Sequence, residues 1–112
     1  MDIIITIPKS IEWGDYQKVL KAVEFGEQTI FFKKVPTLPK NANIGDRCYI
    51  CHKGFVVGYM NIAWIGAMDG FTCTTTDIPW SKGNYIGRSG KFTYIKRIPY
   101  KGFQGYHYAP QD

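Results

Sequence analysis

Three cysteines and a histidine are the residues whose types and spacing come closest to a chemical site. Cys48, Cys51 and His52 spell C-x-x-C-H within "CYICHKG", the pattern by which c-type haem is attached. Together with the distant Cys73, they could also supply four ligands to zinc. Residues three apart on a strand point to opposite faces, whereas haem attachment needs both thiols on one face. We therefore predict no haem. We favour buried strand cysteines over zinc, because a second paired motif is missing.

The other candidate motifs are incomplete. Gly90-Lys91 resembles the end of a phosphate-binding loop, but Tyr85 stands where the earlier glycine is required and Phe92 replaces the Ser or Thr that would reach magnesium. The two histidines stand in no recognisable nucleophile or metalloenzyme motif. We predict no catalytic residue, no metal and no cofactor.

The elements that must position these residues are mostly strands. Apolar residues at helical spacing predict one amphipathic helix over 15–25, stopped by Gly26, and Lys53-Gly54 reads as a hairpin turn. Residues 35–45 and 79–90 read as loops, because prolines, asparagines or glycines interrupt them. Strands are predicted over 2–7, 28–34, 46–52, 55–65, 71–76 and 91–98, and the aromatic tail 99–110 can add a last one. The pattern predicts one α+β, mainly β domain over 1–112: a small curved barrel of five to seven strands with an N-terminal helix packed against it.

The charge is unevenly distributed along the chain. Residues 1–30 carry three lysines and five acids, net −2, whereas residues 31–112 carry eleven bases and four acids, net +7. A surface of one sign attracts polyanions, most commonly the phosphates of nucleic acids. The start lacks a secretory pattern and no stretch is long enough to span a membrane, so we expect a cytoplasmic protein.

The basic and aromatic residues of the last third predict a binding surface. Loops on rigid scaffolds concentrate binding residues, and aromatic rings next to cations hold single-stranded nucleic acid by stacking and by phosphate contacts. Alternation over 91–98 would place Lys91, Thr93 and Arg97 on one face and Phe92, Tyr94 and Ile98 on the other, with Lys96 as an exception on this second face. Trp13, just before the helix, either caps the core or lines a cleft. The predicted nucleic-acid-binding residues are Trp80, Lys82, Tyr85, Arg88, Lys91, Arg97, Lys101 and Gln104.

Three stretches resemble the PUA-like superfamily, in particular ASCH and EVE-type domains, and together they cover most of the chain. In "PKNANIGDRCYICHKGFVVGYMNI" a loop ending in Gly-Asp opens a strand, and a turn and a second strand follow. "EFGEQTIFFKK" resembles the helix end and strand that read Gly-x-Lys-Thr in ASCH domains, and "KFTYIKRIPY" resembles a late barrel strand. The resemblance implies a five- or six-stranded barrel with one or two helices and a nucleic-acid ligand held between helix and barrel.

Some ASCH members that resemble small amidohydrolases act on acetylated cytidine with a lysine, a threonine and a later glutamate. Here Gln28 stands in place of the lysine, Phe31 in place of a second threonine, and no glutamate follows Glu27. This departure argues against that enzymatic activity.

The sequence leaves three functions open. The first is a non-catalytic module that binds RNA, single-stranded DNA or a modified base through its basic, aromatic surface. The second is a small protein-interaction or inhibitor domain, of the kind that phages and mobile elements encode, acting on a nucleic-acid enzyme. The third is an ASCH-like nucleoside or base hydrolase, in which Asp46 or Asp77 would be the acid that turnover requires.

Overall fold

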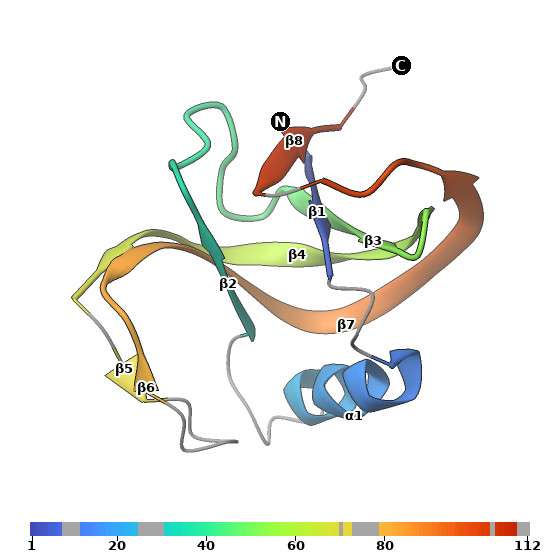
Figure 1. Ribbon diagram of the computed structural model, residues 1–112, viewed down its shortest axis with the longest axis horizontal. Helices are drawn as coiled ribbons and strands as arrows, with labels where there is room; N and C mark the ends of the chain where they lie inside the picture. The colour runs from blue at the N-terminus through green and yellow to red at the C-terminus, as the bar shows by residue number, and fades with distance from the viewer. Residues whose placement is uncertain (8–11, 25–30, 70, 73–78, 104, 110–112) are drawn as a thin grey trace.

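The computed structural model describes residues 1–7, 12–24, 31–69, 71–72, 79–103 and 105–109, and it shows a mainly β fold with one helix (Figure 1). Helix α1 has 12 residues, and no helix in the described ranges is both long and apolar enough to cross a membrane. The elements are β1 Ile3–Thr6, α1 Trp13–Glu24, β2 Phe31–Val35, β3 Arg47–His52, β4 Phe55–Met68, β5 Phe71–Thr72, β6 Pro79–Trp80, β7 Gly83–Pro99 and β8 Tyr106–Tyr108.

Six strands form one sheet in the order β2-β7-β4-β3-β1-β8, which curves into a nearly closed barrel. All neighbours are antiparallel except β1 and β3, which pair in parallel. The two edge strands approach each other, since Pro36 after β2 lies 3.3 Å from where a Cβ of Gly105, just before β8, would stand. Strands β5 and β6 form a separate two-stranded sheet beyond the far end of the β4–β7 hairpin. The predicted barrel with one helix against it is thus confirmed.

The β3–β4 hairpin follows directly from its turn residues. Lys53 and Gly54 both have positive φ, 48° and 86°, as a two-residue turn between twisted strands requires. The turn brings His52 opposite Phe55. The prediction of a Lys53-Gly54 turn is confirmed.

Strand β7 corrects the prediction that residues 79–90 form a loop. Only the part before Gly83 is outside the long strand, and from there β7 runs for 17 residues. Its pairing with β4 shifts register at three places, and Gly90 takes a φ of +82° at one of them. The glycines that interrupt the sequence pattern therefore lie within a bent strand, where they permit irregularities that a side chain would oppose.

The core lies on both faces of the sheet. The main cluster, inside the barrel, contains Ile3, Ile5, Cys48, Ile50 and Val57. A second cluster, on the other face, contains Ile4, Cys51 and Val56, and is covered by Tyr100, Phe103 and other residues of the C-terminal segment. Cys48 and Cys51 thus face opposite sides, as predicted from their spacing.

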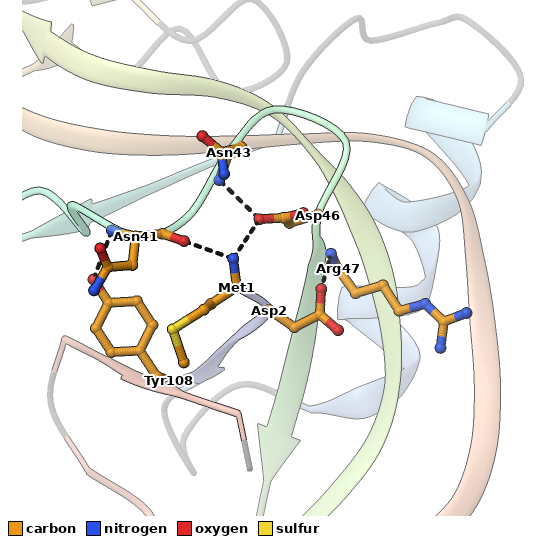
Figure 2. A network of polar contacts seen from close by, with 7 residues as sticks. All are labelled: Met1, Asp2, Asn41, Asn43, Asp46, Arg47 and Tyr108. Atoms are coloured by element: carbon orange, nitrogen blue, oxygen red, sulfur yellow. Dashed lines mark hydrogen bonds and ion pairs between the residues drawn. The ribbon is translucent and has the colours of Figure 1, made fainter. Parts of the chain in front are cut away.

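The long connection from β2 to β3 is fixed to the start of the chain by polar contacts (Figure 2). The Met1 ammonium group donates to the carbonyl of Asn41 over 2.6 Å and pairs with Asp46 Oδ2 at 2.8 Å. Asp46 accepts one hydrogen bond from the Met1 ammonium group and one from the Asn43 amide. Both lower the pKa of Asp46 below its ordinary value, and the bond from Met1 has the larger effect.

Candidate functional site

Two of the predicted binding residues are core residues. Tyr85 is fully buried and donates its hydroxyl hydrogen to the Ser81 carbonyl at 2.5 Å, and Arg88 is 1% exposed. Arg88 Nη1 donates to the hydroxyl of Tyr16 on α1 over 3.1 Å. Both side chains lie in the first part of β7, and Arg88 contacts the helix there, so neither belongs to an exposed loop as predicted. Burial raises the pKa of Tyr16, and the neighbouring guanidinium opposes that shift.

The other predicted residues do not gather at one place. Lys82 is exposed in the turn before β7, Lys91 follows the Gly90 bend, and Lys101 lies in the segment beyond the strand. The backbone of Trp80 belongs to β6, but its side chain lies outside what the structure describes. Gln104 lies outside the described residues altogether.

Arg97, by contrast, lines a cavity of about 300 Å³ between the start of α1 and the β3–β4 hairpin. We call it the Trp13 cavity. It is built from three separate segments of the chain: the entry to α1, the hairpin turn, and the end of β7. Its lining residues are Glu12, Trp13, His52, Lys53, Phe55, Val57 and Arg97.

An irregularity in β7 turns Arg97 into this cavity. Val56 pairs with Ile98 and Gly58 pairs with Tyr94, so three residues of β7 lie opposite Val57 alone. As a result Arg97 shares the α1 side of the sheet with Tyr94, while Ile98 lines a cavity on the other side. The predicted alternation, with Tyr94 and Ile98 on one face and Arg97 on the other, is wrong beyond this point.

Trp13 organises the walls of the cavity. Its ring is half-buried and stacks on Tyr16 and on His52, with ring centroids 5.5 and 5.6 Å apart. It also packs edge-on against Phe92 and Tyr94 of β7. Trp13 therefore fulfils both roles that the sequence left open, since it caps the core and lines the cleft.

The cavity combines aromatic and charged groups. Phe55 is 39% exposed and offers an apolar ring surface. Lys53 and Arg97 are both exposed cations, and Lys53 Nζ lies 4.0 Å from Glu12 Oε2. With two cations against one carboxylate, the formal charge of the lining is +1 when His52 is neutral. An exposed pair such as Lys53–Glu12 contributes little to folding stability, so both groups are available to a ligand.

A second cavity of the same volume, about 300 Å³, lies on the other face of the sheet. We call it the Tyr100 cavity. Its lining includes the Asp2 carboxylate and no cation, and Asp2 Oδ1 accepts from the Arg47 amide over 2.8 Å. The lining residues are Asp2, Ile4, Tyr49, Val56, Ile98, Tyr100 and Ala109. Its negative formal charge makes it the poorer site for an anion.

Cys48 and Cys51, the two cysteines that the structure describes, are buried strand residues. They form no disulfide within the described residues, burial raises the pKa of Cys51, and its thiol lies 3.4 Å from the Tyr100 carbonyl. Among the described residues, no three His, Cys, Asp or Glu side chains are placed to hold a metal ion. Cys73 and Asp77 lie outside the described residues. Asp46 is held in the terminal contacts described above, away from either cavity lining.

Sequence reasoning missed Glu12, Lys53 and Phe55 as a group. Lys53 belongs to the turn that the sequence did predict and Phe55 follows it directly, so the proximity of these two residues was predictable. Their proximity to Arg97 depends on the register between β4 and β7, which could not be predicted from the sequence. A search of family models, of curated proteins and of solved structures finds no match to this chain. The likeness to PUA-like domains stays a prediction from sequence motifs.

Proposed function

We propose that this protein is a non-catalytic nucleic-acid-binding module that holds a nucleotide of a single strand, RNA or DNA, in the Trp13 cavity. The observation that carries the proposal is the meeting of aromatic rings and two exposed cations in one cavity of a basic protein. Bases stack on aromatic rings and on guanidinium planes, while cations neutralise the phosphates beside them.

The size of the cavity suits a small ligand. Ligand sites commonly span about 300–1,000 Å³, so a cavity of about 300 Å³ fits one nucleotide better than a large cofactor. Exposed Lys96 and Lys101 lie on either side of Arg97 along the chain and extend the positive charge beyond the cavity. A strand entering the cavity with one base would therefore meet further cations along its backbone.

The test measures binding of fluorescently labelled, single-stranded RNA and DNA decamers by anisotropy at 50 and 200 mM salt. We expect Arg97→Ala and Phe55→Ala each to weaken binding by roughly five- to 150-fold, the range that follows from about 1–3 kcal/mol per lost stack. Arg97→Ala should also reduce the slope of log affinity against log salt by about 0.7, because one phosphate contact is lost.

The matched control is Lys82→Ala, which removes an exposed cation at the opposite end of β7 from Arg97. Equal losses for Lys82→Ala and Arg97→Ala would show that binding depends on net charge and does not use the cavity. No binding of any decamer at 50 mM salt would refute the proposal.

One observation favours the second candidate, a protein-interaction domain. Ile98 is 53% exposed on the face of the sheet opposite the Trp13 cavity, so a partner protein that contacts it need not occupy that cavity. This candidate predicts a protein complex that survives nuclease treatment and weakens with Ile98→Asp. Arg97→Ala would leave that complex largely intact.

A further inference from the structure

The Glu12 carboxylate is negatively charged, yet it lies in a cavity whose other charged groups favour a bound anion. The proposed phosphate contacts do not explain why an acid lies there. Glu12 is the one acid in a lining that also holds Lys53 and Arg97. Its side chain is 74% exposed, so burial does not hold it there, and its charged neighbour is Lys53 Nζ at 4.0 Å. A carboxylate repels phosphate, and in a site for nucleic acid it contributes favourably where it accepts hydrogen bonds from a base.

We propose that Glu12 makes the Trp13 cavity selective for guanine. This inference rests on the function proposed above and names the base that the same site prefers. An ionised carboxylate is an acceptor with two oxygens and matches two adjacent donors best. Among the four common bases, guanine alone presents two neighbouring donors, the N1–H and the 2-amino group, on its Watson–Crick edge. Adenine and cytosine present one amino group beside a ring acceptor, and uracil presents one N–H between two carbonyls.

The backbone of Glu12 is held in place beside the cavity. The Glu12 carbonyl accepts from the amides of Asp15 and Tyr16, so Glu12 is held at the first turn of α1. Trp13, the next residue, is anchored by its stack on His52. Lys53, at 4.0 Å from Glu12, then lies beside the bound base and next to the phosphate or to guanine O6, which is an acceptor.

Asp15 provides a matched control. It belongs to the same turn of α1, its side chain is also 74% exposed, and it faces Lys18 at 3.9 Å as Glu12 faces Lys53. It is not among the residues that line the cavity. Any effect of acid removal on helix stability or on total charge is therefore shared by Glu12→Gln and Asp15→Asn, while an effect on base selection is not.

The experiment uses labelled pentamers of uridine whose central base is guanine, adenine, cytosine or hypoxanthine, with the intact protein. We expect guanine to bind roughly tenfold or more tightly than adenine or cytosine, as a bidentate contact predicts. Hypoxanthine lacks the 2-amino group and should bind several-fold more weakly than guanine. Glu12→Gln should abolish the difference between guanine and hypoxanthine, and Asp15→Asn should preserve it.

The outcomes separate the two proposals. Equal affinity for all four pentamers, together with loss of binding in Arg97→Ala, would overturn guanine selection and leave the proposed function standing. A guanine preference that survives in Glu12→Gln would overturn the role of Glu12. Absence of binding to every pentamer and decamer would refute the proposed function and the inference with it.

Discussion

The two halves of β7 contain similar residues in opposite environments. In the first half, Tyr85, Ile86 and Arg88 are buried, and Arg88 contacts Tyr16 of α1. In the second half, Tyr94 is 56% exposed and Arg97 is exposed beside the Trp13 cavity. Both halves contain an arginine and a tyrosine, yet both members of the first pair are buried and both members of the second are exposed. Residue type along a strand therefore does not distinguish a binding residue from a structural one, because that depends on what covers the strand.

The largest expected effect comes from comparing the two arginines. Arg88→Ala removes a buried side chain and leaves the Tyr16 hydroxyl without this donor, so we expect a loss of about 3 kcal/mol in the free energy of unfolding. Arg97→Ala removes an exposed side chain and should change stability by less than about 0.5 kcal/mol. Urea denaturation followed by tryptophan fluorescence measures both. Similar losses in the two variants would contradict the division of β7 into a buried and an exposed half.

Phe92, in the exposed half of β7, is buried and packs against Gly58 of β4. A substitution at Gly58 tests this contact. A Cβ at Gly58 would lie 2.6 Å from two carbons of the Phe92 ring and closer still to the Thr93 carbonyl oxygen. Gly58→Ala should therefore destabilise the fold by about 1–3 kcal/mol through overpacking.

Gly14 of α1 is the control for Gly58, because nothing lies within 4 Å of where its Cβ would stand. Gly14→Ala should stabilise the protein slightly, by about 0.5–1 kcal/mol, through helix propensity. Thermal denaturation of the two variants measures both changes. A Gly58→Ala protein as stable as the wild type would mean that β4 and Phe92 are not in close contact.

The smallest effect is expected at an exposed ion pair outside β7, that of Met1 with Asp46. The pKa of Asp46 is lowered in the folded state, so its contribution is present above the unfolded-state value near 3.8 and is lost as the pH falls further. The stability difference between wild type and Asp46→Asn should therefore be present at pH 7 and shrink towards pH 3. Denaturation curves at several pH values measure it, and a difference that is independent of pH would show that the pair contributes nothing in solution.

Local patterns predicted those parts of the fold that depend on near neighbours. The helix, the Lys53-Gly54 turn and the opposite orientation of Cys48 and Cys51 all follow from residues within a few positions of each other. The start of β7 was missed because the glycines in "GNYIGRSG" favour a loop locally. Pairing with β2 and β4, which are distant in sequence, overrides that preference.

The candidate site was predicted only in part for the same reason. Arg97 was identified from its charge, but its direction depends on three residues of β7 lying opposite one residue of β4. Arg88 was misplaced because its partner, Tyr16, is 72 residues away. Glu12, Trp13, Lys53 and Arg97 converge through tertiary structure, and periodicity within one segment carries no information about such convergence.

The position of β1 in the sheet has a consequence for biosynthesis. This strand is made before the other strands of the sheet, yet its two neighbours are β3 and β8, and Ile3 lies opposite both Cys48 and Tyr108. Until residues 106–108 are made, one side of β1 presents unpaired amides and carbonyls, which attract other strands. Pairing across so many residues is also slow, because the long intervening loop must first be closed. The sheet is therefore completed only once β8 has been made, and until then the open edge of β1 is a site where non-native strand pairing can begin.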